Sequence, residues 1–260
     1  MDYISITNLS KKFEGNGQIV PALQGINLTL SRGEFACLLG PSGCGKSTLL
    51  NAVAGFIQPS SGEIVVDGRP VIEPGPERGV VFQEYAIFPW MTVYRNIAFG
   101  LEIQGSSATE TAGRVDALLD KLGLREFRDR FPKDLSGGMR QRVAIARLLA
   151  IDSPVMLMDE PFGALDALTR RTLQDELLRI WRESGKTILF VTHSIEESLY
   201  LANRIVVMTY RPGTIKHDQT VTMEYPRDPA GVEFNELKRE LGRLVMEEQE
   251  RHTRDEMKMV

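Results

Sequence analysis

The chain has 260 residues, of which 42% are hydrophobic and 25% are charged, and its formal net charge is -4. A chain of this size can bury its own core, so folding requires neither disulfides nor a structural metal. The mildly acidic balance argues against a nucleic-acid partner, because dedicated nucleic-acid binders carry a concentrated basic surface. Two cysteines, Cys37 and Cys44, are too few for a disulfide framework and indicate a reducing compartment.

The first residues show no secretory signal, and no apolar run reaches the roughly 18 residues that a membrane-spanning helix needs. We therefore expect that any role at a membrane requires docking onto another chain.

The first third of the chain predicts strands. Residues 4–6 and 26–30 alternate apolar and polar side chains, which predicts an antiparallel sheet with one solvated face. Residues 35–39 are apolar throughout, which favours a strand covered on both faces, and residues 155–158 and 188–191 share this pattern. Buried strands that alternate with helical segments predict a parallel sheet with crossover connections.

Helical periodicity appears in three later segments, and the last of them, from Ala230, predicts a docked amphipathic helix with frayed terminal residues. Ser107 and Glu110 form a capping box just before the first segment. The apolar stripes are Val115, Leu118, Leu119 and Leu122; Leu173, Leu177, Ile180 and Trp181; and Phe234, Leu237, Leu241 and Leu244.

A phosphate-binding loop follows the buried strand at residues 35–39. Residues 40–47 read G-P-S-G-C-G-K-S and match the motif G-x-x-x-x-G-K-[ST]. In such a loop successive backbone N–H groups surround phosphate oxygens at a helix N-terminus. Lys46 is expected to reach the β- and γ-phosphates, and the Ser47 hydroxyl to bind Mg²⁺. We interpret Cys44 as a small filler residue rather than a redox group. The predicted nucleotide-binding residues here are Gly40, Pro41, Ser42, Gly43, Cys44, Gly45, Lys46, Ser47 and Thr48.

Two acids end the apolar run at residues 155–158. Phosphoryl transfer needs an acid that holds the metal and a group that positions the attacking water. Asp159 would hold Mg²⁺, directly or through water, and Glu160 would polarise the water. The alternative is a solvated acidic turn. The phosphate loop upstream favours the metal-holding and water-positioning roles over this alternative.

His193 directly follows the apolar strand expected at residues 187–192 and precedes a capping box at Ser194 and Glu197. A histidine at the end of a parallel strand can contact a γ-phosphate. A purely structural histidine is the alternative.

Residues 134–142 resemble the signature motif of the ABC ATPase family, LSGGQ, with Met139 in place of glutamine. Gln83 resembles the Q-loop of that family, Asp166 its D-loop, and His193 its switch histidine. Phe13, beside Lys11 and Lys12, resembles the aromatic residue that stacks on adenine. The signature residues are Leu135, Ser136, Gly137, Gly138 and Met139. The substitution at Met139 removes any polar contact that the glutamine makes.

This resemblance implies an α/β P-loop NTPase fold, with a RecA-like, mostly parallel sheet, an N-terminal antiparallel β subdomain and an inserted α-helical subdomain. It implies ATP and Mg²⁺ as cofactors, with Lys46, Glu160 and His193 as catalytic residues and Ser47, Gln83 and Asp159 at the metal. The single domain, residues 1–260, would comprise a catalytic lobe (1–87 and 154–220), a helical subdomain with the signature (88–153) and a short helical tail (221–260).

Ser136 can cap the helix that begins at Gly137, which creates a second helix N-terminus suited to an anion. Because one chain already has a complete phosphate loop, a second site suggests a second chain. The family arrangement is a head-to-tail pair, identical or paralogous, with each ATP between Lys46 of one subunit and Ser136 of the other.

Residues 76–83, 88–93 and 159–166 resemble the ATPases of nitrate, sulfonate and taurine importers, a group that includes bicarbonate importers. The implied partners are a second ATPase subunit, integral-membrane permease subunits docking near residues 83–90 and, indirectly, a solute-binding protein, with no nucleic acid. The implied location is the cytoplasmic face of the cell membrane. Alternatives are a soluble ABC ATPase without a transport role and the energising subunit of an exporter.

Two further expectations concern the aromatic residues near the Q-loop and the C-terminal segment. The aromatic residues of 85–90 suit an interface with the permease, but packing between lobes explains them equally well. The segment after Arg211 is too short for the regulatory β-domain that maltose-type importers carry, so none is expected.

Overall fold

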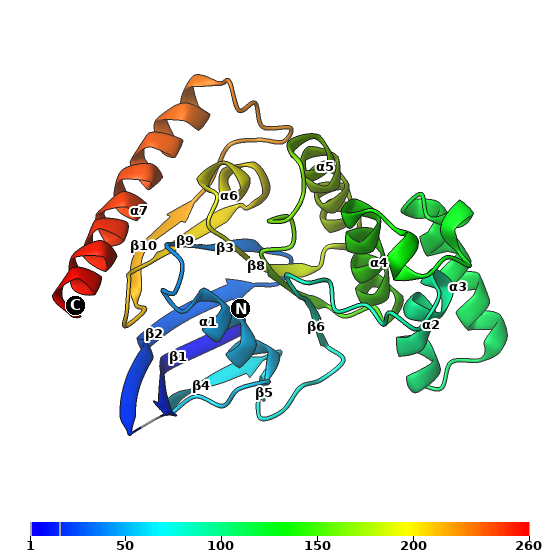
Figure 1. Cartoon of the computed structure of the whole chain (residues 1–260), viewed down its shortest axis with the longest axis horizontal. Coiled ribbons are helices and arrows are strands. Elements are labelled where there is room, and N and C mark those ends of the chain that lie inside the picture. Colours follow the sequence, from blue (N-terminus) through cyan, green and yellow to red (C-terminus); the bar gives the residue numbers. More distant parts are fainter. Residues whose placement is uncertain (1, 16, 260) are drawn as a thin grey trace. The chain divides into compact units, whose positions relative to one another are not determined.

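Figure 1 presents the computed structural model of the chain, which describes residues 2–15 and 17–259. The chain forms two compact units, one comprising residues 1–75 and 185–260 and the other residues 76–184. The lobe boundaries expected near residues 87 and 153 both fall inside the second unit, and the division into lobes stays a prediction.

An antiparallel sheet opens the first unit, as residues 4–6 and 26–30 predicted. Ile4 pairs with Leu30 and Ile6 with Leu28, and the apolar side chains of both strands are buried while their neighbours are more exposed. The strand order is β2-β1-β4-β5, with β1 at Asp2–Gly15, β2 at Gln18–Ser31, β4 at Ser61–Val66 and β5 at Arg69–Pro70.

The first unit also contains four strands in the order β10-β9-β3-β8. They are β3 (Phe35–Leu39), β8 (Thr187–Thr192), β9 (Arg204–Met208) and β10 (Ile215–Thr220). β3 runs parallel to both β8 and β9, and β10 is antiparallel to β9. Every residue of β3 and β8 is buried, which confirms the expectation from their continuous apolar sequences. Because parallel strands end at one edge, the segments after β3 and β8 share that edge.

Three helices complete the first unit: α1 (Lys46–Ala54), α6 (Ile195–Leu201) and α7 (Val232–Met259). α1 contacts β8 and β2, so it lies between the two sheets, whereas α6 contacts β3 and β8 from the other side (Figure 1). α7 buries Phe234 and Leu241 completely, which confirms the predicted docked amphipathic helix. The described residues after Arg211 form β10 and α7.

In the second unit a pair of parallel strands is combined with helices. The strands are β6 (Arg78–Val81) and β7 (Val155–Asp159); the helices are α2 (Val93–Ile103), α3 (Ala108–Lys121), α4 (Gly137–Ala150) and α5 (Ala167–Ser184), with short 3-10 turns at Arg125–Phe127 and Pro132–Asp134. The predicted capping box begins α3: Ser107 Oγ accepts from the Glu110 N–H at 3.3 Å, and Glu110 accepts from the Ser107 N–H at 3.0 Å. Helices α2, α3 and α4 pack against one another.

Candidate functional site

The loop between β3 and α1 has the backbone that a phosphate site needs. Gly45 has a φ of +98°, in the left-handed region, and a Cβ atom there would lie 2.7 Å from Leu23 Cδ2 and 3.0 Å from the Ala22 carbonyl oxygen. Only glycine fits both constraints. All the predicted nucleotide-binding residues from Gly40 to Thr48 lie in this loop or in the first turn of α1, where backbone N–H groups favour an anion.

Lys46 turns its ammonium group back into the loop. Its Nζ donates hydrogen bonds to the carbonyl oxygens of Gly40 and Pro41, both at 2.8 Å, and lies 3.7 Å from Cys44 Sγ. The residue is only 4% exposed. The loop therefore holds a positive charge in place before any ligand arrives, and phosphate oxygens would compete with the loop's own carbonyls for it.

Cys44 is fully buried within the loop. Burial raises the pKa of its thiol, and the nearby Lys46 lowers it only in part. A buried thiol with a raised pKa is inert, because the thiolate is the reactive form. These contacts agree with the interpretation of Cys44 as a packing residue.

His193 lies at the same sheet edge as the phosphate loop. Leu39, the last residue of β3, pairs with Thr192, the last residue of β8, so Gly40 and His193 are the next residues of neighbouring strands. His193 is exposed, and Ser194 after it caps α6 by accepting a hydrogen bond from the Glu197 N–H at 3.2 Å. The structure thus brings together two predicted elements that lie far apart in sequence.

Phe13 lies near the end of β1 and is 44% exposed. Lys11 Nζ lies 5.2 Å from the centre of its ring, and also donates to the Gln58 carbonyl oxygen at 2.8 Å. An exposed aromatic face with a cation beside it can stack on a nucleobase. The adenine-stacking role of Phe13 stays a prediction.

In the second unit the acidic pair lies at a comparable strand edge. The first four residues of β7 are buried, and Asp159 and Glu160 follow them at intermediate exposure. Val81 of the parallel strand β6 pairs with Met158, so the segment that leads to Gln83 leaves the sheet at the same edge. Gln83 itself is exposed. A carboxylate pair and an amide are therefore presented together within this unit.

Glu160 has a φ of 44°, in the left-handed region that residues with a side chain rarely adopt. Such a conformation costs about 1–3 kcal/mol and persists only where the surroundings enforce it. The Gly163 N–H donates to the Glu160 carbonyl oxygen at 3.2 Å and closes a turn there. Strain held at the end of a buried strand is typical of a functional position.

Asp166 caps α5 and is held in place by its own turn. Its Oδ1 accepts from the Thr169 N–H at 3.0 Å, and this contact lowers the pKa of the carboxyl group. Arg170, one turn into α5, donates to the carbonyl oxygens of Phe162 at 3.2 Å and Leu165 at 2.7 Å. Arg170 thus fixes the loop between Glu160 and Asp166, a role that no sequence motif indicated.

The signature segment forms a capped and accessible helix N-terminus. Ser136 is exposed, and its Oγ accepts from the Met139 N–H at 3.3 Å, which confirms it as the cap of α4. Gly138 is buried, and a Cβ there would lie 2.6 Å from Thr169 Cγ2 of α5. The second signature glycine therefore has a packing role beside the exposure of backbone N–H groups. Leu135 is buried, whereas Gly137 and Met139 are partly exposed.

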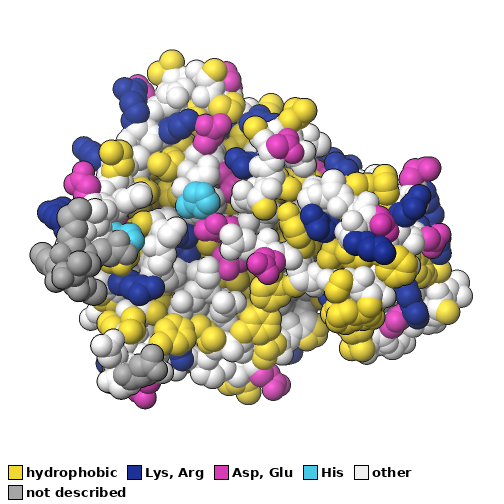
Figure 2. Space-filling model, viewed as in Figure 1, with side chains coloured by type: hydrophobic (Ala, Val, Ile, Leu, Met, Phe, Trp, Pro, Cys, Tyr) yellow, Lys and Arg dark blue, Asp and Glu magenta, His cyan; other side chains and the backbone are white. Residues whose placement is uncertain are grey.

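The aromatic segment before α2 is held rigidly within the second unit. The buried Asn96 accepts from the Phe88 N–H at 2.8 Å and donates to the Met91 carbonyl oxygen at 3.0 Å. The Arg147 guanidinium lies 4.4 Å from the Phe88 ring centre, and burial lowers its pKa. The Trp90 ring lies tilted against the Phe88 ring, with ring centres 5.6 Å apart, yet Trp90 is 71% exposed. Figure 2 shows hydrophobic side chains gathered on the visible face of this unit, amid interspersed acidic and basic residues.

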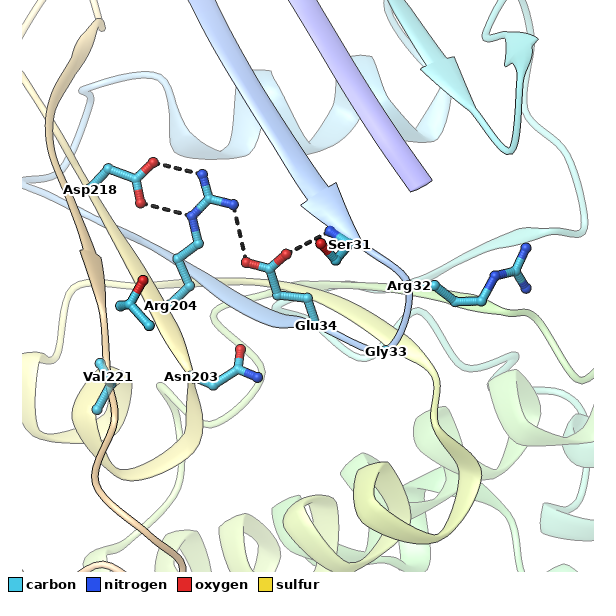
Figure 3. A pocket seen from close by; sticks show the side chains of 9 residues that line it. Ser31, Arg32, Gly33, Glu34, Asn203, Arg204, Asp218 and Val221 are labelled. Carbon is cyan, nitrogen blue, oxygen red and sulfur yellow. Dashed lines mark hydrogen bonds and ion pairs between the residues drawn. The ribbon is translucent and has the colours of Figure 1, made fainter. Parts of the chain in front are cut away.

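A cavity of about 700 Å³ lies away from these motifs. Residues 31–34 line it and precede β3, whereas the phosphate loop follows β3 at the opposite end. In Figure 3 Arg204 lies between Glu34 and Asp218, and its nitrogens are 3.1 Å and 2.7 Å from their carboxylate oxygens. These pairs raise the pKa of Arg204 and satisfy its charge, so we regard the cavity as a structural feature.

Within residues 2–15 and 17–259, none of the helices combines the length and the hydropathy needed to cross a bilayer.

Comparison with known proteins identifies the family to which the chain is similar. Residues 23–163 match the family described as ABC transporter. An ABC transporter ATP-binding protein of Methanocaldococcus jannaschii is 48% identical and covers 94% of this chain and 92% of its own length. A taurine import ATP-binding protein of Roseobacter denitrificans is 53% identical (83% and 81% covered), and a nitrate import ATP-binding protein of Synechocystis is 46% identical (92% and 90%).

Among solved structures, a dimeric bacterial ABC transporter cassette aligns with a TM-score of 0.76 and 32% identity, covering 85% of this chain and all of that one. A dimeric ATP-binding cassette in a post-hydrolysis state with ADP and Pi aligns with a TM-score of 0.75 and 30% identity, at the same coverage. These alignments confirm the predicted P-loop NTPase fold. The chain belongs to the ABC transporter family and is an ATP-binding, ATP-hydrolysing cassette of that family.

Proposed function

We propose that this chain powers a membrane importer for a small anionic solute of the sulfonate, taurine, nitrate or bicarbonate type. The observation that carries the proposal is its 53% and 46% identity to ATP-binding proteins named for taurine import and nitrate import, over most of each chain. Exporter and soluble ABC roles are the alternatives, and they predict different partners.

The partners test this proposal. Tagged chain, purified from gently solubilised native membranes, is expected to bring with it a polytopic membrane protein, and mass spectrometry of the eluate identifies it. A solute-binding protein encountered through that permease would point to the solute. Copurification of ribosomes or DNA-bound factors, or of no membrane protein, would contradict the importer function and leave the ATPase chemistry standing.

The chemistry is a hydrolysis of ATP at the phosphate loop. The loop N–H groups and Lys46 bind the phosphates, and Glu160 accepts a hydrogen bond from the attacking water. The water oxygen bonds to the γ-phosphorus and gives up a proton to Glu160 as the bond from this phosphorus to the bridging oxygen breaks, which releases ADP and phosphate. His193 contacts the γ-phosphate and orients it.

The residues proposed for Mg²⁺ have suitable donor atoms. Ser47, Gln83 and Asp159 offer hydroxyl, amide and carboxylate oxygens, the ligands that this cation prefers. Among the described residues, no three or more His, Cys, Asp or Glu side chains lie together in a way that could hold a metal ion. No such group is required, since Mg²⁺ is usually held by one or two carboxylates together with substrate phosphates and waters. When bound it neutralises charge on the transferring phosphoryl group.

A second cassette, identical or paralogous, completes each site. The chain carries two helix N-termini suited to anions, one behind the phosphate loop and one behind Ser136. In a head-to-tail pair each ATP would lie between Lys46 of one subunit and Ser136 of the other. The dimeric state of the cassettes that align with this chain supports the presence of a second cassette.

The permease would dock at the rigid aromatic segment around Trp90, which keeps the chain peripheral, on the cytoplasmic face of the membrane. Exposed aromatic residues on a held backbone are typical anchors of interfaces. A substitution at Trp90 tests this interface role of residues 83–90.

Replacing Trp90 by alanine is expected to weaken permease binding by about 2 kcal/mol, the loss usual for an anchor residue. Solute uptake should fall, while the isolated subunit keeps its ATPase rate and melting temperature, because the side chain is largely exposed. The measurement is uptake together with permease copurification. Ile103→Ala is the control, since Ile103 is an equally exposed apolar residue at the far end of α2. Normal uptake by the Trp90 variant would contradict the interface.

A further inference from the structure

The hairpin between β9 and β10, residues 209–214, lies against the phosphate loop. Arg211 Nε donates a hydrogen bond to the Gly43 carbonyl oxygen at 2.9 Å. Gly213 touches the same loop so closely that a Cβ there would lie 2.2 Å from the Cys44 carbonyl oxygen. The hairpin therefore contacts two consecutive residues of the loop.

The contact with Arg211 fixes the orientation of one peptide group. A trans peptide points its C=O and its N–H in opposite directions. Since the Gly43 carbonyl faces Arg211, the N–H of the same peptide, on Cys44, faces the other way. That N–H donates a hydrogen bond to the Pro41 carbonyl oxygen, with the nitrogen 3.4 Å from the oxygen, so it points into the loop. Arg211 thus holds one backbone donor of the phosphate loop turned inward, where a phosphate oxygen would compete with the Pro41 carbonyl for it.

The hairpin itself is braced by its own polar groups and by β2. The Thr209 N–H donates to the Thr214 carbonyl oxygen at 3.0 Å, and Thr209 Oγ1 accepts from the Thr214 N–H at 2.9 Å. The Gly213 N–H donates to Ala22 at 2.9 Å, and the Gly213 carbonyl accepts from Gln24 at 3.0 Å. Movement of the hairpin as a body would therefore carry Arg211 with it.

Helix α7 holds the hairpin from the other side, and Figure 1 shows it running alongside β9 and β10. Glu248 is 1% exposed and accepts from the Tyr210 N–H at 2.9 Å and from Lys216 Nζ at 2.7 Å. His252 stacks on the Tyr210 ring, with centres 4.2 Å apart. Burial raises the pKa of Glu248, but the bonds from Lys216 and Tyr210 outweigh it and lower that pKa, so the carboxylate stays charged.

We propose that Arg211 is a positioning residue for nucleotide phosphate and that α7, through Glu248 and the hairpin, sets the geometry of the phosphate loop. The inference rests on the proposed ATPase function of that loop and extends it to the last helix of the described chain. Both residues lie outside the phosphate loop, so each would act on affinity through the backbone of residues 43 and 44.

Five variants test the inference, with Mg-ADP affinity measured by titration calorimetry and folding by thermal melts. Arg211→Gln is expected to raise the Kd roughly five- to tenfold, the range seen for residues that couple to a site without contacting the ligand. Arg211→Lys should recover part of the loss. Glu248→Gln is expected to raise the Kd roughly threefold. Glu247→Gln is the matched control, because Glu247 also pairs with Lys216 but has no contact with Tyr210 among the hydrogen bonds described.

The effect should fall on the KM for ATP more than on kcat, which a general loss of folding would not produce. Arg239→Gln controls for loss of an arginine, because Arg239 also donates to a backbone carbonyl, of Asn235 at 3.2 Å. Unchanged ADP affinity in Arg211→Gln would overturn the inference. The proposed ATPase function would still stand, provided that the wild type binds ADP. Unchanged affinity in Glu248→Gln alone would overturn the part played by α7. Absence of ADP binding in the wild type would instead overturn the proposed function.

Discussion

Glu160→Gln is expected to lower ATP turnover by about 10²- to 10⁴-fold, the usual contribution of a positioned general base. Glutamine has the same side-chain size as glutamate and can adopt the same backbone conformation, with φ at 44°, so only the charge is lost. Nucleotide affinity should survive, because the phosphate loop and Lys46 are untouched. In Mg-ATP the variant should then accumulate as an ATP-bound dimer, measured by light scattering, since hydrolysis no longer separates the pair.

Glu102→Gln provides the comparison, because it removes an exposed carboxylate in the same unit, on α2. Its turnover should equal that of the wild type. A Glu160→Gln protein that hydrolyses ATP normally would overturn the assignment of the base. One that stays monomeric in Mg-ATP would overturn the sandwich of two cassettes.

Lys46→Ala should weaken ATP binding by about 10- to 100-fold, because a hydrogen bond to a charged group contributes about 1.5–3 kcal/mol. The loss has two sources. The phosphates lose their cation, and the carbonyl oxygens of Gly40 and Pro41 lose the donor that holds them. Titration calorimetry with Mg-ATP measures the first effect, and a lower melting temperature of the free protein reports the second.

Lys238→Ala separates these effects from a general loss of positive charge. Lys238 lies on α7 in the same unit and pairs with Glu196 on the surface. An exposed pair of this kind contributes little to stability, so affinity and melting temperature should barely change. Wild-type ATP affinity in Lys46→Ala would show that the phosphate loop is misassigned.

Local patterns predicted the elements that present the site. The continuous apolar runs of β3 and β8 indicated buried parallel strands, and parallel pairing then places the residues after them at one edge. The helix caps at Ser107 and Ser136 could also be predicted from the sequence, because a cap depends on residues within one helical turn. The glycine motif of the phosphate loop reflects backbone geometry, which is also local.

Residues that hold the site from a distance could not be predicted. Arg211 reaches Gly43 across 168 positions, and Glu248 reaches Tyr210 across 38, so no periodicity connects them. Arginine and glutamate in polar, exposed-looking segments are usually solvated. The packing role of Gly138 against Thr169 was hidden for the same reason, since it depends on how α4 meets α5.

The burial of both cysteines makes the natural chain suitable for site-specific spectroscopy. Cys37 and Cys44 are the only thiols in the sequence, and both are inaccessible with a raised pKa. Maleimide reagents attack exposed thiolates, so a single cysteine introduced at Leu168, which is 79% exposed, would carry nearly all of a fluorophore or spin label. Distances between two such labels could then follow the opening and closing of a cassette pair without first removing the thiol inside the phosphate loop.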